Sequence, residues 1–297
     1  MAYYHAFGFL IQSDTDLPHL LPADNCEGEP DVIVRQANLD QYHNILPEGV
    51  TTLLRNNAVY FETPIGQFLV SDGRTIEYEP AGSIPAAHMG AYFMGHCMGG
   101  ILHQRGLYPI HCSCVADDKR AVIICGDSGA GKSTLAAEFL NNGWKLLTDD
   151  VAAIDNIHTI PTVSPSFPSQ KLWPHSMDAY GLEKDRVHAF YEREEGLKYG
   201  VDVTDKFLNE PRPLSLIVWL VPVDDRCSLT TLSGMEKIDL LMYNTYNSFM
   251  LPKEDHSKLF RHRVALSTKV PMVRVHRQNG INTAKQLFDM ITNYLEE

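Results

Sequence analysis

The feature that most constrains the fold of this chain is a glycine-rich loop between two regular segments. The loop reads GDSGAGKS over residues 126–133 and matches the pattern G-x-x-x-x-G-K-[ST] in full. RAVIICG before it reads as a buried strand, and KSTLAAEFLNNG after it reads as a helix that Gly143 is placed to end. A strand, a loop and a helix in this order predict an α/β sheet with the loop at the carboxyl end of a strand.

The composition of the loop indicates that it binds nucleotide phosphates. Glycines let the backbone turn several N–H groups inward onto phosphate oxygens, and the N-terminus of the following helix adds its dipole. In such loops the lysine reaches the β- and γ-phosphates and the hydroxyl after it ligates Mg²⁺, which assigns these roles to Lys132 and Ser133. The residues expected to contact the nucleotide are Gly126, Asp127, Ser128, Gly129, Ala130, Gly131, Lys132, Ser133 and Thr134.

A pair of carboxylates follows the loop closely. Asp149 and Asp150 stand in LLTDD, 17 residues after Lys132 in the case of Asp149. The helix between is just long enough to return the chain, so we expect the next strand to end near the phosphates. One carboxylate can accept the proton of an attacking hydroxyl while the other holds Mg²⁺. An ordinary strand-end turn is the plainer interpretation, because aspartates are common in turns, but the neighbouring loop favours function.

The rest of the chain predicts two regions. Residues 1–86 consist of short β-rich stretches separated by turn residues, such as DVIVRQ and TIEYEP. Residues 87–297 are expected to form the α/β catalytic domain. It begins with a buried helix over 87–105, whose methionines and histidines are expected to pack in a core because they lack metal-ligand spacing. Further predicted elements are a strand, a turn and a continuation over 144–155, strands at 215–224 and 271–277 and helices at 236–251 and 283–297.

Charge and cysteine content exclude several classes of function. The net charge is −12, and an acidic chain repels a phosphate backbone, so nucleic-acid binding is disfavoured. The start of the chain lacks the basic and apolar regions of a signal peptide, and no apolar run reaches the ~18 residues of a membrane span. None of the six cysteines form a CxxC pair, as expected for buried thiols in a reducing compartment. We therefore expect a soluble, cytoplasmic protein.

The stretch PIHCSCVADDKRAVIICGDSGAGKSTLAAEFLNNGWKLLTDDVAAID resembles the catalytic core of HPr kinase/phosphorylase. It combines a histidine before the loop strand, the GDSGxGKS loop and the acidic pair. The resemblance implies a P-loop kinase fold related to ATP-dependent phosphoenolpyruvate carboxykinase and the use of ATP and Mg²⁺. By position, Asp149 matches the family's catalytic base, Asp150 its acidic neighbour at the metal and His111 its active-site histidine.

One family signature is missing from this chain. HPr kinases carry a motif close to E-[IV]-R-G-L-G after the acidic pair, whereas the corresponding region here reads SFPSQKLWPHSMDAYG. FGFLIQSDTDLPHL, HQRGLYPIHCS and KLWP instead resemble HPr-kinase-related proteins of bacterial biosynthetic clusters. Some of these accompany lasso-peptide precursors and phosphorylate a serine at the precursor's C-terminal end. The resemblance therefore implies a kinase for a peptide or small-protein serine rather than for the sugar-transport carrier.

Several alternatives stay open on the sequence alone. A kinase for HPr itself, a small-molecule kinase and a non-catalytic ATP-binding module all fit the loop, and the residues favour neither ATP nor GTP. In YEREEGLKYG, Arg193 and Lys198 are candidates to stabilise the transferred phosphoryl group, although a solvated charged turn is the plainer interpretation. Trp173 is expected to be a packing anchor. The N-terminal region is a candidate for substrate binding or for assembly into a homo-oligomer.

Overall fold

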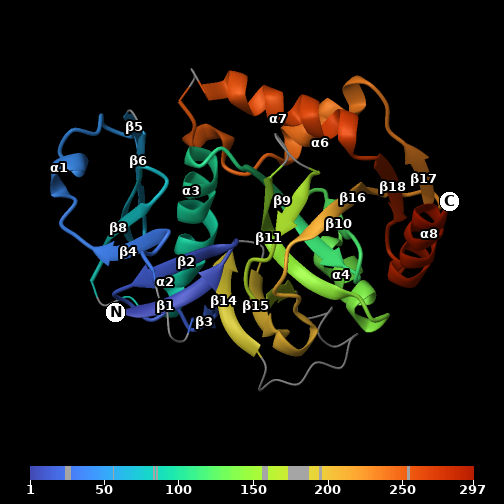
Figure 1. Ribbon diagram of the computed structural model, residues 1–297, viewed down its shortest axis with the longest axis horizontal. Coiled ribbons are helices and arrows are strands. Elements are labelled where there is room, and N and C mark those ends of the chain that lie inside the picture. Colours follow the sequence, from blue (N-terminus) through green and yellow to red (C-terminus); the bar gives the residue numbers. More distant parts are fainter. Residues whose placement is uncertain are drawn as a thin grey trace.

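The structure is a computed structural model of the whole chain. It describes residues 1–297 except for 24–27, 56, 83, 85, 156–159, 173–186, 194–195 and 253–254. At residues 86–88, 187–193 and 196–198 only the backbone is described. The N-terminal sheet and the loop-bearing part of the chain lie on opposite sides of one helical segment (Figure 1).

The N-terminal sheet has eight strands in the order β3-β1-β2-β4-β8-β7-β6-β5. The strand β4 pairs in parallel with both β2 and β8, and the other neighbours are antiparallel. Its strands are short because turn residues interrupt each apolar run, as at Asp72 and Gly73, both of which have positive φ. The bounds are β1 Ala2–Ala6, β2 Phe9–Ser13, β3 Leu21–Pro22, β4 Val32–Gln36, β5 Thr52–Arg55, β6 Ala58–Thr63, β7 Gly66–Ser71 and β8 Thr75–Pro80, with the short helix α1 Asp40–His43 before β5.

One helical segment packs against this sheet. It consists of α2 Ala86–Tyr92, a π-helical turn η1 Phe93–Cys97 and α3 Met98–Gln104. Phe93, Cys97 and Met98 are fully buried, in the same core cluster as N-terminal residues such as Phe68. This is the core packing that the apolar faces of the segment predicted. The cluster also takes in Val151 beside the acidic pair, so the two parts of the chain share one core.

The second sheet carries the glycine-rich loop. Seven strands lie in the order β10-β9-β11-β12-β16-β18-β17, and β16 also pairs with β10, which closes five of them into a ring. All five residues of β10 are buried, because helices cover both faces of the sheet. The bounds are β9 Tyr108–Ala116, β10 Ala121–Cys125, β11 Lys145–Asp155, β12 Thr162–Ser164, β16 Arg212–Val223, β17 Ser228–Thr231 and β18 Met272–Gln278.

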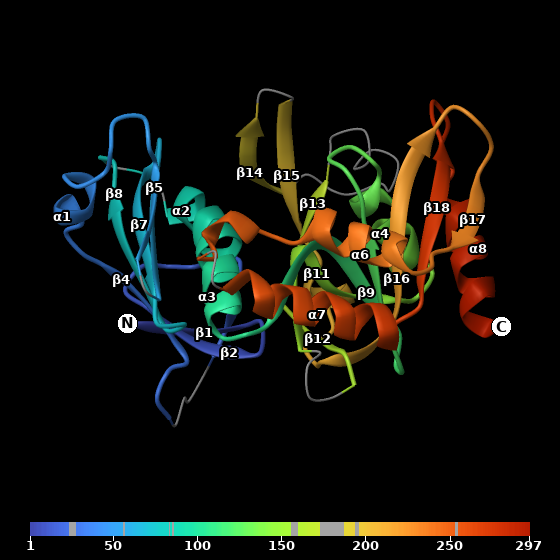
Figure 2. The ribbon, with the colours of Figure 1, turned by 90° about the horizontal axis from the view of Figure 1, so that it is seen from above.

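Four helices cover the second sheet. The apolar faces of α4 Lys132–Asn141 and α8 Ala284–Glu296 pack on one side, against Val122 and Ile124 of β10. The helices α6 Met235–Asn244 and α7 His256–Lys269 pack on the other, against Ile123. Successive side chains of β10 therefore pack against two different helical layers (Figures 1 and 2).

A three-stranded sheet lies next to the acidic pair. It has the order β13-β15-β14, with bounds β13 Ser169–Leu172, β14 Val187–Arg193 and β15 Gly196–Asp202. Two 3₁₀ turns, η3 Thr204–Lys206 and η4 Ser248–Met250, complete the described elements. Its three strands all lie between β12 and β16 in the sequence.

The structure corrects two expectations about these elements. The strand after α4 does not end at the acidic pair: β11 runs on to Asp155, and it is separated from β10 by β9, which is antiparallel to both. The sheet is therefore mixed, because β9, which precedes the loop in the sequence, lies between β10 and β11 and runs antiparallel to both. The helix predicted over 236–251 ends at Asn244, since Thr245 already adopts an extended conformation, and Asn247 with positive φ then precedes η4.

Two sequence expectations concern the chain as a whole. In the described residues, no helix combines the length and the apolar character that crossing a bilayer requires. The described cysteines are free thiols, four of them buried. The division of the chain into residues 1–86 and 87–297 stays a prediction.

Candidate active site

The glycine-rich loop connects β10 to α4 through three glycines with positive φ. Gly126, Gly129 and Gly131 have φ of 146°, 79° and 102°. A Cβ at Gly126 would lie 2.4 Å from the carbonyl oxygen of Leu220, so only glycine fits there. Gly129 faces open space, and Gly131 is the N-cap of α4. The loop geometry thus depends on glycine at the position that touches the neighbouring strand.

The side chain of Lys132 folds back into the loop. It is buried, and its ammonium donates to the carbonyl oxygens of Gly126 at 2.7 Å and Asp127 at 3.0 Å. Within the described chain, the amides of Gly129 and Gly131 have no hydrogen-bond acceptor. An ammonium group and unused N–H donors at a helix N-terminus form a site that suits an anion.

Asp149 lies next to the serine that follows the lysine. Its two carboxylate oxygens are 3.3 Å and 3.4 Å from the Ser133 hydroxyl oxygen. They also accept hydrogen bonds from the Ser113 hydroxyl and, at 2.7 Å, from the backbone N–H of Lys171. Burial raises the pKa of Asp149, while these hydrogen bonds pull the pKa in the opposite direction. The result is a desolvated carboxyl group held at the mouth of the loop.

Strand register explains how the acidic pair reaches the loop. Ser113 of β9 pairs with Asp149 of β11 on one side and with Ile124 of β10 on the other. One strand, β9, thus separates the acidic pair from the end of β10. The side chains of Ser113 and Asp149 point to the face that α4 covers, where Ser133 lies in the first turn of the helix.

Asp150 has a different environment from its neighbour. Its φ is +98°, an uncommon conformation for a residue with a side chain. The carboxylate forms an ion pair with Lys171 at 2.7 Å. It also lies 3.4 Å from Nδ1 of His111, which bonds to the backbone carbonyl of Asp150 at 2.9 Å. Two basic side chains therefore surround the second carboxylate.

His111 is held as a neutral imidazole. Burial lowers its pKa, and the nearby ammonium groups of Lys132 and Lys171 add to this effect, while Asp150 opposes it. Because a carbonyl oxygen can only accept, the Nδ1 of a neutral His111 carries the proton and Nε2 is left with its lone pair. The ring stacks on Tyr246, with centroids 6.1 Å apart.

The structure brings together most of the residues that the sequence selected. The loop, Ser133 and Asp149 converge directly, and His111 and Asp150 form a second group connected to the first through Lys171. Thr134 continues α4 behind the loop. Trp173 and the side chains of Arg193 and Lys198 lie outside the described residues.

Several residues at the site were missed by sequence reasoning. Ser113 and Lys171 contact the acidic pair from β9 and β13, and Gln170 donates to the carbonyl of Ser133 at 2.9 Å. Lys171 is the first residue of the KLWP element, which was the one available signal for it. On the other side of the loop, the Asn244 side chain accepts from the N–H of Gly126 at 3.2 Å.

Arg277 is a further residue that local sequence did not single out. It lies at the carboxyl end of β18, and a Cβ on Gly131 would be 3.5 Å from its Cδ. Its Nε is buried without a hydrogen-bond partner in the described structure, while one terminal nitrogen donates to Asn279 at 3.2 Å. A guanidinium group beside the loop adds a second cation to the anion site.

The residues present fit Mg²⁺, which prefers oxygen ligands and keeps several waters. The Ser133 hydroxyl and the Asp149 carboxylate are close enough to share one coordination sphere. Asp150, which the sequence placed at the metal, forms an ion pair with Lys171, and its role at the metal stays a prediction. Among the described residues, no group of three His, Cys, Asp or Glu side chains forms a metal cluster.

Comparisons with known proteins add a distant likeness. No protein-family model matches the chain, and no curated protein sequence matches it. Among solved structures, it is similar to the Hpr(Ser) kinase/phosphatase from Coxiella burnetii, with a TM-score of 0.33 and 15% sequence identity. The alignment covers 63% of this chain and 89% of that one. At these values the likeness carries no conclusion about the chemistry of the present chain.

Proposed function

We propose that this protein is a Mg·ATP-dependent kinase that transfers the γ-phosphoryl group to a serine hydroxyl of a peptide or small protein. The glycine-rich loop holds the nucleotide phosphates, and the acidic pair activates the acceptor. Precursor peptides of the lasso type are the expected acceptors, following the sequence resemblance. The sequence motif and the geometry of the site support this proposal together.

The observation that carries the proposal is the contact between Ser133 and Asp149. The serine belongs to the phosphate loop, and the carboxylate comes from a strand that is not a neighbour of the loop strand, yet their oxygens are 3.3 Å apart. A mere structural turn would not require a carboxylate at this position, because burying a charged group is costly even where hydrogen bonds satisfy it. The contact therefore supports phosphate binding and proton acceptance at adjacent positions.

Asp149 is the proposed general base. Its raised pKa makes it a better proton acceptor than an exposed carboxylate, while the N–H of Lys171 and the hydroxyl of Ser113 fix its orientation. Lys132 and the loop amides bind the phosphate oxygens and hold them in line with the acceptor. When bound, Mg²⁺ would offset the negative charge on those oxygens.

His111, Asp150 and Lys171 position the carboxylate of Asp149. The ion pair between Lys171 and Asp150 holds the β13 backbone against Asp149, because the same residue supplies the N–H that Asp149 accepts. Neutral His111 locks the backbone of Asp150 through its carbonyl oxygen. These residues keep the carboxylate of Asp149 aimed at the loop.

The proposal is tested by mass spectrometry of serine peptides incubated with Mg·ATP. The peptide library includes sequences that end in serine, each with an alanine counterpart as the matched control. The wild-type protein is expected to add about 80 Da, one phosphate, to serine peptides only, and Asp149→Asn is expected to add none. Phosphorylation of metabolites but of no peptide would contradict the peptide acceptor. Nucleotide binding without transfer to any acceptor would contradict a kinase.

A further inference from the structure

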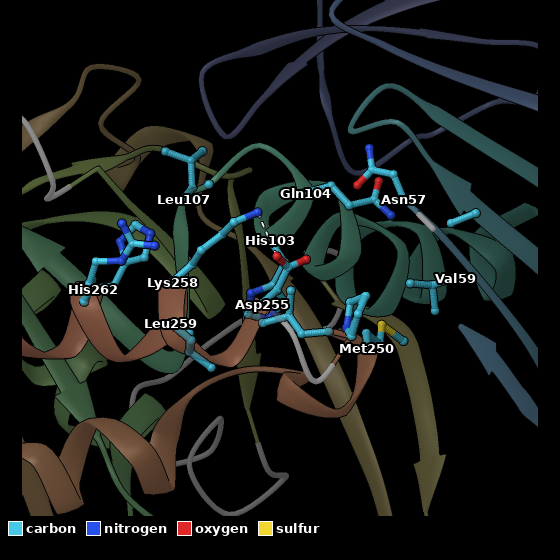
Figure 3. Close-up of a pocket in the computed structure, with 15 residues that line it drawn as sticks. Asn57, Val59, His103, Gln104, Leu107, Met250, Asp255, Lys258, Leu259 and His262 are labelled. Carbon is cyan, nitrogen blue, oxygen red and sulfur yellow. Dashed lines mark ion pairs between the residues drawn. The ribbon is translucent and has the colours of Figure 1, made fainter. Parts of the chain in front are cut away.

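A second cavity lies away from the glycine-rich loop, between the N-terminal sheet, α3 and α7 (Figure 3). Its volume is about 270 Å³, which is room for a small metabolite. Val59 lines it from β6, His103 from α3 and Leu259 from α7. We call it the α3–α7 pocket. Because its walls come from distant parts of the sequence, a bound molecule would bridge them.

Part of the lining is apolar. Val59, Leu107, Met250 and Leu259 line the cavity from β6, the link between α3 and β9, η4 and α7 (Figure 3). Val59 and Leu259 are almost completely buried, so they give a preformed apolar surface. Such a surface suits a hydrocarbon or aromatic group on the ligand.

The charged part of the lining has an excess of cations. Among the described lining residues, Lys258 and Arg261 are basic and Asp255 is acidic. The ammonium of Lys258 lies 2.7 Å from the Asp255 carboxylate, which leaves one basic group in excess. A single negative charge on the ligand would balance the pocket, while a dianion would meet the Asp255 carboxylate.

The two histidines of the pocket add hydrogen-bonding groups and not charge. Burial lowers the pKa of His103 to about 4, and it also lowers the pKa of His262. Both rings are therefore neutral near pH 7. The His262 ring is fixed by stacking on Tyr108, with centroids 5.9 Å apart.

The pocket is connected to the acidic pair through Tyr246. Nε2 of His103 bonds to the backbone carbonyl of Tyr246 at 2.8 Å. The Tyr246 ring stacks on His111, which bonds to Asp150. A Cβ on Gly99 would lie 2.9 Å from the Tyr246 ring, so the helix holds that ring closely. The contacts form a continuous path from the pocket to the site.

We propose that the α3–α7 pocket binds a small monocarboxylic acid with an apolar body, and that its occupancy changes the environment of His111 through Tyr246. The carboxylate lies against Lys258 and Arg261, and the apolar body lies against Met250 and Leu259. The proposal does not depend on phosphotransfer, because both of its parts are measured without nucleotide.

Binding is tested by calorimetric and NMR titration with 4-phenylbutyrate, its neutral amide and phenyl phosphate. The carboxylate is expected to bind about tenfold or more tightly than the amide, a difference of about 1.4 kcal/mol. Equal affinity for the acid and the amide would overturn the proposal. The absence of any binding at about 10 mM acid, tenfold above a Kd of about 1 mM, would also overturn it. Tighter binding of phenyl phosphate than of the acid would overturn the monocarboxylate assignment.

Variants locate the binding event. Lys258→Met and Arg261→Met are surface changes that are expected to weaken binding of the acid about two- to fivefold each. Lys285→Met is the matched control, because Lys285 also pairs with an aspartate along a helix, at 3.6 Å from Asp289. Binding that survives both pocket substitutions, or that the control weakens equally, would place the acid elsewhere and overturn the proposal.

The connection to the acidic pair has its own readout. The acid is expected to shift the imidazole resonances of His111 in the wild-type protein, and Tyr246→Leu is expected to abolish that shift while binding persists. The His111 resonance is assigned by its loss in His111→Gln. Binding with an unmoved His111 resonance, or a shift of the same size in Tyr246→Leu, would contradict the path through Tyr246.

Discussion

The glycine-rich loop and the acidic pair meet at one edge of the second sheet, but different kinds of contact hold them. The loop is built from its own residues: its glycines set the backbone, and Lys132 bonds to the loop's own carbonyl groups. The acidic pair is held by side chains from other strands, among them Ser113 and Lys171. Local contacts make the phosphate site recognisable in the sequence, whereas long-range contacts set the protonation and direction of the carboxylates.

The loop is most easily broken at Gly126. Gly126→Ala places a Cβ 2.4 Å from a backbone oxygen at φ 146°, and we expect a loss of about 3 kcal/mol or more of unfolding free energy together with nucleotide affinity. Gly129→Ala is the control, because its Cβ meets open space and the positive φ alone costs about 1–2 kcal/mol. Urea unfolding and nucleotide titration measure both effects. Equal losses in the two variants would show that contact with Leu220 is irrelevant.

The acidic pair is expected to respond to Lys171. Lys171→Met removes the cation beside Asp150 and keeps the backbone N–H to Asp149, and we expect transfer to fall about 10–100-fold. The positive charge of Lys171 lowers the pKa of Asp149, so its removal raises that pKa further. The base then stays protonated to higher pH, and the acid limb of the pH–rate profile moves to higher pH.

The control for Lys171 stands on the neighbouring strand. Lys145 of β11 bonds to the carbonyl of Asp205 at 2.9 Å, away from the carboxylates. Lys145→Met is therefore expected to leave the pH–rate profile unchanged. Lys171→Arg restores the charge and is expected to recover part of the rate. An acid limb that does not move in Lys171→Met would contradict the claim that Lys171 sets the pKa of Asp149.

A smaller effect is expected on stability. Asp149 has a raised pKa, so the stability that its protonated form contributes is fully present below the ordinary carboxyl pKa of about 4 and is lost as pH rises through the raised value. Asp149→Asn cannot ionise, and we expect its Tm at pH 7 to exceed that of the wild type by roughly 2–4 °C. The gain is expected to vanish below pH about 4. Calorimetry over this pH range checks it, and a lower Tm for the variant at pH 7 would contradict the sign.

The sequence predicted the local part of the site better than its long-range part. The loop and the helix start were readable because glycine spacing and the strand–helix order determine them within eight residues, Gly126 to Ser133. The proximity of Asp149 to Ser133 was also expected, although through a strand that ends at the pair. The structure reaches the same proximity by a different route, because β9 lies between β10 and β11.

The remaining parts could not be read from local pattern. Ser113 stands opposite Asp149 only because of the register between β9 and β11, which no motif encodes. Lys171 comes from a separate three-stranded sheet, and Arg277 from the end of β18. The helix over 236–251 was predicted too long because the chain leaves the helical conformation at Thr245, where no glycine or proline marks the end of the periodic pattern.

The central claim is that the loop binds the nucleotide and the acidic pair drives transfer. Its most direct test is to measure Mg·ATP affinity and single-turnover phosphoryl transfer in Lys132→Ala and Asp149→Asn side by side. The account predicts that Asp149→Asn binds Mg·ATP within about threefold of the wild type while transfer falls about 10²–10⁴-fold. Lys132→Ala is expected to lose both. Undiminished nucleotide affinity in Lys132→Ala, or wild-type transfer in Asp149→Asn, would contradict the claim.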